Sequence, residues 1–244
     1  MTFPRDSSDP FSLSFVSFHV KTLLLWDIDG TLIDSGGAGL RALTTALKTV
    51  FGHAGSLADI EFSGRTDRWI MRQVFAKFGI PATEENFNRY FDGYAHALPG
   101  ELVRPHARVL TGVRPLLAAA AARDDITQGL LTGNLRRCAE VKLGFHGLWS
   151  FFSFGAFADD AEHRNELGPH ALRRAQDHAG VEFAAGQVWV IGDTPHDIAC
   201  GKAIGAQTLA VATGLHSLEI LAAAQPTALL RDLGDHEEFF RIIG

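Results

Sequence analysis

Short apolar runs that end in acidic residues or glycine constrain the fold of this chain most. The first run, TLLLWD at Thr22–Asp27, has four large apolar residues in a row. Such a run predicts a strand that is buried on both faces, as in a parallel sheet. Similar runs follow residue 105 and alternate with amphipathic helices, so we predict further strands at 126–132, 151–157, 187–191 and 208–211. Regular alternation of this kind predicts an α/β fold with a doubly wound, Rossmann-like parallel sheet.

The segment 36–104 has a different pattern. Apolar residues recur at helical spacing over 36–51, 66–78 and 84–98, and no strand-like run separates these helices. We therefore expect a small α-helical insertion, 36–104, into a core formed by 20–35 and 105–244. Ser35-Gly36-Gly37 and the region near Pro105 are the expected hinges between the two parts, because paired glycines can absorb a movement of the insertion.

The overall composition is that of a globular protein, with 46% hydrophobic and 20% charged residues. Residues 1–19 differ in being rich in Ser, Pro and Asp, so we expect an N-terminal extension that is either disordered or a weak edge strand. A net charge of −6 argues against general binding to nucleic acid. No run of 18 apolar residues suggests a membrane span. Two distant cysteines, Cys138 and Cys200, predict buried thiols in a cytoplasmic protein.

Reactive residues stand where four predicted strands end. They occur in Asp27-Ile28-Asp29-Gly30-Thr31-Leu32, in Leu131-Thr132-Gly133-Asn134, in Asp159-Asp160 with Arg164 shortly after, and in Gly192-Asp193-Thr194-Pro195-His196-Asp197. The carboxyl ends of parallel strands meet at one edge of a sheet, and ligands bind there. We therefore expect these residues to converge on one site.

Acids at this edge are compatible with chemistry on a phosphate ester. A carboxylate nucleophile and a phosphate monoester are both negative, so they approach only when a cation neutralises them. Asp27 and Asp193 would provide an oxygen-rich site for Mg²⁺, which polarises phosphoryl oxygens. Asp29 lies two residues further on, where it can protonate a leaving alcohol and then deprotonate water. A simpler interpretation of both strand-end acids is a turn in which Asp caps the backbone.

The remaining polar residues have roles in the same reaction. Thr132 offers a hydroxyl, and Gly133 and Asn134 offer backbone N–H groups for phosphoryl oxygens. Arg164 would supply a fixed positive charge to the transferring phosphoryl group, unless it is a solvated surface residue. Asp197 would hold a metal-bound water or orient its neighbours, or else favour the first turn of a helix.

The motifs identify a resemblance to the haloacid dehalogenase (HAD) superfamily, in particular to the phosphoglycolate-phosphatase-like branch with a helical C1-type cap. The resemblance runs from Lys21 to the C-terminus, and its most specific part is the DxDGTL signature that begins at Asp27. It implies that Asp27 attacks phosphorus to form an aspartyl-phosphate. It also implies metal ligation by Asp27, the backbone carbonyl of Asp29 and Asp193, with Asp197 nearby.

The chain departs from the family pattern at the third motif, which usually contains a lysine. No lysine lies between Lys142 and Lys202, and Arg164 occupies the matching region. Arginine keeps the charge but is planar and larger. In the cap, Arg65 either reaches the substrate, as cap loops of the family do, or is an exposed residue at a helix start.

The resemblance implies an Mg²⁺-dependent phosphatase that hydrolyses a small phosphorylated metabolite, phosphoglycolate or a sugar phosphate among them. The same core serves a phosphomutase of the β-phosphoglucomutase type, and a non-catalytic binding module is a third hypothesis. Asp29 argues against a dehalogenase, which has no need of this acid. The expected partner is the small metabolite, with neither nucleic acid nor membrane, and the chain would be a monomer or a homodimer.

Overall fold

The computed structural model describes residues 21–104 and 106–244, and its centre is a parallel sheet. Within these residues the sheet has six strands in the order β5-β4-β1-β6-β7-β8, and every neighbouring pair is parallel. The strands are β1 (Thr22–Trp26), β4 (Ile126–Leu131), β5 (Gly155–Ala156), β6 (Val188–Gly192), β7 (Gln207–Val211) and β8 (Ala228–Leu230). The predicted α/β class with a Rossmann-like sheet is confirmed.

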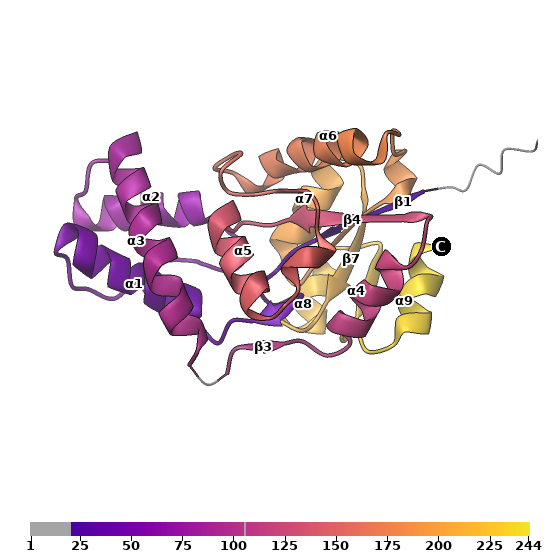
Figure 1. Cartoon of the computed structure of the whole chain (residues 1–244), viewed down its shortest axis with the longest axis horizontal. Coiled ribbons are helices and arrows are strands. Elements are labelled where there is room, and N and C mark those ends of the chain that lie inside the picture. Colours follow the sequence, from indigo (N-terminus) through magenta and orange to yellow (C-terminus); the bar gives the residue numbers. More distant parts are fainter. Residues whose placement is uncertain (1–20, 105) are drawn as a thin grey trace, which may run out of the picture.

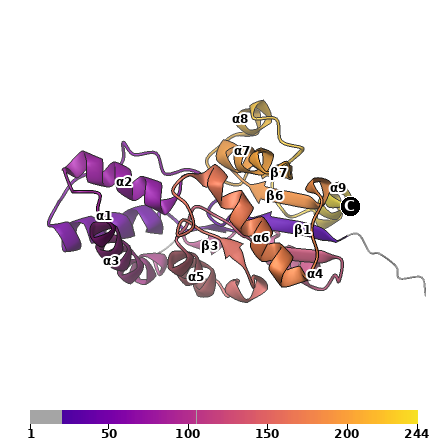
Figure 2. The same ribbon diagram turned by 90° about the horizontal axis from the view of Figure 1, so that it is seen from above.

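Helices cover both faces of the sheet, as the continuous apolar run of β1 requires. Leu24 and Trp26 belong to a hydrophobic cluster with α4, α5 and α9, whereas Leu23 and Leu25 pack on the opposite face with α6 and α7. Figures 1 and 2 show this layering. The helices are α4 (Val113–Ala121), α5 (Arg136–Phe145), α6 (Leu167–Ala179), α7 (Pro195–Ala203), α8 (Leu218–Ala223) and α9 (His236–Ile243).

Three helices form a separate cap, at the left of Figure 1. They lie between the short strands β2 and β3, which pair antiparallel where the chain leaves and re-enters the core. The bounds are β2 (Ile33–Asp34), α1 (Ala38–Phe51), α2 (Asp67–Phe78), α3 (Glu84–Leu102) and β3 (Arg108–Val109). The three helices occur where the sequence predicts them, and the domain boundaries at residues 36 and 104 remain a prediction.

The cap has its own hydrophobic cluster, which the core completes. Phe75, Phe87 and Tyr90 make ring contacts within it, with centroids 4.9 and 5.6 Å from Phe75. Leu135 and Cys138, from the core loop and helix that follow β4, belong to the same cluster. The cap therefore packs directly on the end of the sheet at which the polar residues lie.

One predicted strand is wrong in extent. The run 151–157 begins at the last residue of a 3₁₀ turn, Trp149–Phe151, and contains only two strand residues, Gly155–Ala156. Among residues 21–104 and 106–244, β5 is an edge strand that pairs only with β4. The phenylalanines fill the core without a long ladder: Phe152 and Phe157 pack with one cluster and Phe154 with the other.

Other expectations have simpler outcomes. Cys138 and Cys200 are buried free thiols, as predicted. No helix within the described residues is both long and apolar enough to cross a bilayer.

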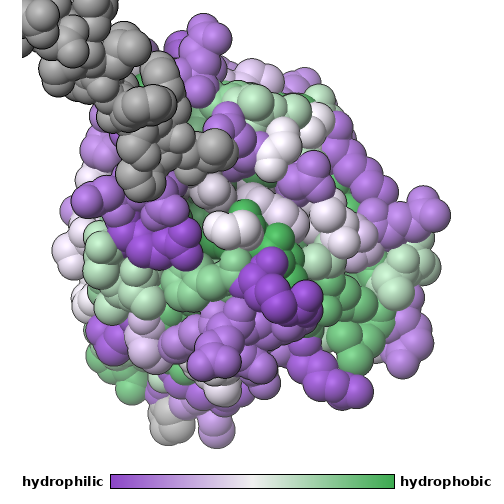
Figure 3. Space-filling view, turned by 90° about the vertical axis from the view of Figure 1, so that its right-hand side faces the viewer, coloured by the Kyte–Doolittle hydropathy of each residue, from purple (hydrophilic) through white to green (hydrophobic). Residues whose placement is uncertain are grey.

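The proposed extension at 1–19 and the hinge at Pro105 lie outside the described residues. Hydrophilic and hydrophobic residues are intermixed on the end of the molecule seen in Figure 3, and the choice between monomer and homodimer remains a prediction.

Candidate active site

A cavity of about 590 Å³ lies where the cap meets the carboxyl end of the sheet. Asp27, Asp29, Asn134, Arg164 and Asp193 all line it, although they come from separate segments of the chain. The convergence follows from the parallel sheet, because β1, β4 and β6 are neighbours and end at the same edge.

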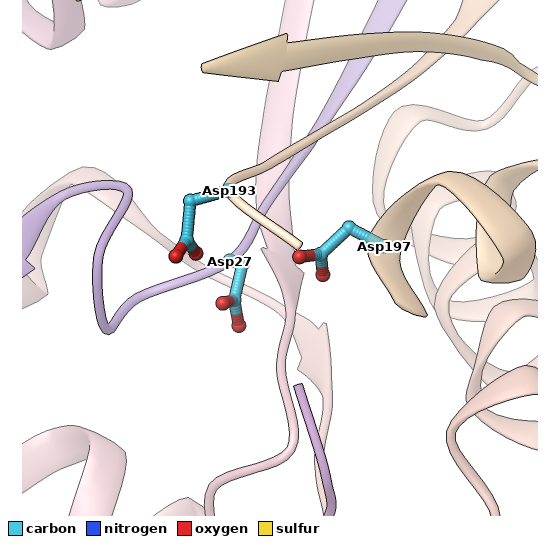
Figure 4. A group of neighbouring side chains, drawn as sticks. All are labelled: Asp27, Asp193 and Asp197. Carbon is cyan, nitrogen blue, oxygen red and sulfur yellow. The ribbon is translucent and has the colours of Figure 1, made fainter. Parts of the chain in front are cut away.

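Three aspartates form a buried acidic cluster beside this cavity. Asp27, Asp193 and Asp197 each offer a carboxylate oxygen, and these oxygens lie within 4.8 Å of one another (Figure 4). Burial raises the pKa of Asp27 to about 6, against the opposing charge of Arg164. Burial, together with the charges of Asp197 and Asp27, also raises the pKa of Asp193 well above its usual value. The cluster thus has an excess of negative charge that a divalent cation would neutralise.

Gly30 makes room for one member of this cluster. Its φ of +81° lies in the left-handed region, and a Cβ at this position would stand 2.3 Å from Oδ2 of Asp193. The hydroxyl of Thr31 donates to Oδ1 of the same aspartate at 3.3 Å. The turn after β1 therefore places Asp193 against Asp27, and only glycine fits at position 30.

Arg164 lies directly beside Asp27. Its Nη2 is 3.0 Å from Oδ1 of Asp27 and also forms an ion pair with Asp197, and the side chain is 6% exposed. Two further arginines, both on α6, lie elsewhere: Arg173 is near His170, and Arg174 pairs with Asp160. Of these three arginines, Arg164 is the one that supplies a positive charge to the acidic cluster.

Asp197 already has partners for both oxygens. Oδ1 pairs with Arg164, and Oδ2 accepts from the backbone N–H of Thr194 at 3.0 Å and from its hydroxyl at 2.7 Å. Thr194 is in turn the N-cap of α7. Asp197 therefore both orients Arg164 and stabilises the first turn of a helix.

Asp29 has a different set of partners. Its Oδ2 accepts from Nζ of Lys142 at 2.6 Å and from Nδ2 of Asn134 at 2.9 Å. Burial alone would raise the pKa of Asp29, but the charge and hydrogen bond of Lys142, with the bond from Asn134, hold it below its usual value. Two carboxylates two residues apart thus have opposite pKa shifts.

Lys142 is the site residue that sequence reasoning missed. It lies on α5 and its side chain is 5% exposed, in a stripe with the buried residues Cys138, Ala139 and Leu143. A lysine three and four residues after apolar positions of the same helix face was the available signal. Such a lysine is buried at considerable expense unless it has an ionic partner.

The loop after β4 is one of the places where the cap contacts the core. Thr132 is fully buried beneath this loop, and its Oγ1 accepts from the backbone N–H of Asn134 at 3.3 Å and from the Asn134 amide at 2.9 Å. The carbonyl of Gly133 accepts from the Asp67 N–H at 2.7 Å, and the Leu135 N–H donates to Asp67 Oδ2 at 2.8 Å. The cap is therefore docked on the loop through backbone groups.

Arg65 lines the cavity, but its charge is engaged within the cap. Its guanidinium donates to Glu61 at 2.9 and 2.6 Å and lies 4.5 Å from the ring centroid of Trp69. Its backbone carbonyl approaches Gly133 so closely that a Cβ there would be 2.2 Å from the oxygen. The rest of the cap wall is mainly apolar, and it includes Leu40, Leu43, Phe62, Ile70 and Tyr94.

This chain resembles known proteins in sequence and in fold. Residues 24–202 match the model of a family described as haloacid dehalogenase-like hydrolase. "Probable phosphatase IndB" of Dickeya dadantii is 28% identical over 217 residues, covering 86% of this chain and 90% of the relative. "Pyrophosphatase PpaX" of Bacillus cereus is 26% identical over 213 residues, covering 87% and 93%. A solved structure titled as a predicted phosphoglycolate phosphatase from Haemophilus somnus has a TM-score of 0.68 at 18% identity, covering 91% and 99%.

Proposed function

Because the chain belongs to the haloacid dehalogenase-like hydrolase family, we propose that it is a Mg²⁺-dependent phosphatase that hydrolyses a small phosphorylated metabolite. Phosphoglycolate-like compounds and sugar phosphates are the proposed substrate class. The observation that carries the proposal is the buried Asp27, which lies 3.0 Å from Arg164 and within 4.8 Å of two further acids on a cavity under the cap. The names of IndB and PpaX, both phosphatases, support the reaction class.

In the proposed mechanism Asp27 attacks phosphorus, the bond to the leaving oxygen breaks, and an aspartyl-phosphate forms. Asp29, in the protonated fraction of the protein, gives its proton to the leaving oxygen. It then takes a proton from the water that attacks the aspartyl-phosphate, which releases phosphate and frees Asp27. Arg164, held by Asp197, stabilises negative charge on the transferring group.

The donor set fits Mg²⁺, a hard cation that prefers oxygen ligands. Carboxylate oxygens of Asp27 and Asp193 and the backbone carbonyl of Asp29 are the proposed ligands. The oxygens of Asp197 already have hydrogen-bond partners, so we propose that it acts on the metal through water or through Arg164. When bound, the cation would neutralise the acids and the phosphate so that nucleophile and substrate can approach.

Substrate contacts are proposed for the loop after β4 and for the cap. Gly133 and Asn134 line the cavity next to Arg164 and would bind phosphoryl oxygens. Thr132 lies beneath them and orients Asn134 while its hydroxyl remains a proposed phosphoryl donor. Arg65 is proposed to contact the remainder of the substrate, for which it would exchange its bond with Glu61.

The test is phosphate release from a panel of metabolites by metal-stripped protein. The panel includes phosphoglycolate, hexose 1- and 6-phosphates and pyrophosphate, each with EDTA or with added Mg²⁺. We expect hydrolysis of at least one ester with Mg²⁺ and none with EDTA. Turnover that persists in EDTA would contradict the proposed metal site.

The same assay separates the alternatives. Interconversion of hexose 1- and 6-phosphates without release of phosphate would assign a phosphomutase. If no substrate turns over, binding of Mg²⁺ with beryllium fluoride at Asp27 should be measured by calorimetry. Absence of both turnover and binding would favour a non-catalytic module.

A further inference from the structure

Lys142 makes two short contacts that have no part in the proposed mechanism. Its Nζ lies 2.6 Å from Oδ2 of Asp29 and 2.6 Å from Oδ1 of Asn134. Asn134 completes a triangle, because its Nδ2 donates to the same Oδ2 at 2.9 Å. Two donors from different segments therefore converge on one oxygen of the proposed acid/base.

The environment makes this arrangement hard to explain by stability alone. The Lys142 side chain is 5% exposed and lies on the apolar stripe of α5. A buried ion pair gains little over well-packed apolar side chains, because both charges lose their hydration. The pair does, however, fix geometry, since breaking it would leave a charge buried without a partner.

The position of Lys142 also connects the pair to the space under the cap. Lys142 lines the cavity together with Asp29 and Tyr94. A Cβ added at Gly39 of α1 would lie 3.4 Å from the Tyr94 hydroxyl and 3.8 Å from Nζ of Lys142. The buried Asp67 of α2 is a further nearby acid whose negative charge favours the charged lysine. The leaving group of a substrate on Asp27 would extend toward this region.

We propose that Lys142 is a positioning residue for Asp29, an inference that rests on the proposed phosphatase function. Lys142 and Asn134 together hold Oδ2 by two hydrogen bonds, which turns Oδ1 toward the leaving oxygen. A carboxylate fixed in this way keeps the orientation in which it can exchange a proton with the leaving oxygen and then with water.

The test compares two substrates that differ in their need for this proton. The leaving group of p-nitrophenyl phosphate departs as a stable phenolate, whereas an alkyl phosphate must have its leaving oxygen protonated. Lys142→Met should lower kcat about 100-fold on the alkyl ester and less than about threefold on p-nitrophenyl phosphate, because the loss of a positioned acid removes about that factor. The matched control is Lys202→Met, a lysine on α7 whose one side-chain bond within the described part of the chain is to the Ala224 carbonyl, and it should change neither rate.

A double mutant protects the test against misfolding. Asp29→Asn with Lys142→Met removes both charges and leaves no unpaired ion in the core. Its rates should equal those of Asp29→Asn alone, because Lys142 acts through Asp29. Lys142→Arg, which keeps a donor and the charge, should recover part of the alkyl-ester rate.

The outcomes separate the two proposals. Equal losses on both esters, or a double mutant far slower than Asp29→Asn, would overturn the positioning role while leaving the phosphatase function intact. A wild-type protein that releases phosphate from neither ester, nor from any metabolite of the panel, would overturn the proposed function and this inference with it.

Discussion

Asp27 and Asp29 are two residues apart on one strand end, yet the protein surrounds them differently. Asp27 faces the core motifs, with Arg164 at 3.0 Å and two further aspartates nearby, and its pKa is raised to about 6. Asp29 faces the cap with Lys142 at 2.6 Å, and its pKa is lowered. Each acid thus lies beside a buried, positively charged side chain: Arg164 for Asp27 and Lys142 for Asp29.

This difference shows how one turn can hold two carboxylates with separate roles. A divalent cation beside Asp27 would lower its raised pKa and keep the nucleophile ionised. The excess negative charge around Asp27 suits a site for a cation and a phosphate, whereas the fixed partners of Asp29 suit an oriented proton carrier. The mutations below test each side of this comparison.

The largest effect is expected on the Asp27 side. Asp27→Asn removes the nucleophile and should lower kcat at least about 10⁴-fold on every phosphate ester, whatever its leaving group. Phosphate release measures the loss, and far-UV circular dichroism checks that the fold is kept. A variant that retains a tenth of the wild-type rate would show that Asp27 is not the nucleophile.

Removing Arg164, the positive charge beside Asp27, should have the next largest effect. Arg164→Ala should lower kcat about 10²- to 10³-fold, because a buried positive charge at the transferring group is lost. Arg173→Ala, an exposed arginine on α6, is the control and should stay within about twofold of wild type. Similar rates for the two variants would move the role of Arg164 elsewhere.

The contact between cap and core offers a steric test. Gly133→Ala would place a Cβ 2.2 Å from the Arg65 carbonyl, so the cap loop cannot dock as it does in the wild type. We expect kcat/KM to fall about tenfold or more, since closure positions the substrate. Gly144→Ala on α5 meets nothing within 4 Å and should leave kcat/KM unchanged. Equal kinetics would mean that cap docking at this loop does not limit the reaction.

The smallest effect is one of stability, on the cap side. Burial raises the pKa of Asp67 from 3.8 to about 6. A folded-state pKa above the unfolded value means that the folded protein loses stability as pH rises from about 4 to about 6 and keeps that loss at higher pH. Asp67→Asn cannot ionise, but its side-chain oxygen can still accept from the Leu135 N–H. Relative to wild type it should gain up to about 3 kcal/mol in the free energy of unfolding between pH 4 and pH 8.

Urea unfolding of both proteins at the two pH values measures this difference. A lower free energy of unfolding for Asp67→Asn would mean that Asp67 is stabilised as a carboxylate, because the charge of Lys142 then outweighs the effect of burial. In that case Lys142 would stabilise two negative charges, those of Asp29 and Asp67.

The sequence predicted the parts of this molecule that follow from local pattern. The apolar run before Asp27, the alternation of helices and strands, and the family motifs were sufficient for the fold class and for the superfamily, both of which are confirmed. They also predicted that Arg164 would occupy the place of the usual lysine. The structure brings Arg164 beside Asp27, and its catalytic role remains a prediction.

Features that depend on tertiary packing were out of reach. Lys142 contacts Asp29 from 113 positions along the chain, and only the tertiary packing of α5 brings them together. The pairing of Arg65 with Glu61 depends on the conformation of the cap loop, which no motif specifies. The short extent of β5 reflects its place at the sheet edge, where phenylalanines pack without further pairing.

The most direct test of the account is to trap the phosphorylated carboxylate. The Asp29→Asn variant should form the intermediate and hydrolyse it slowly, so it is quenched in acid after mixing with Mg²⁺ and p-nitrophenyl phosphate. Borohydride then reduces the acyl phosphate, and peptide mass spectrometry locates the modified residue. We predict modification at Asp27 alone, dependent on both Mg²⁺ and substrate. Modification of Asp193 or Asp197 in place of Asp27 would contradict the account.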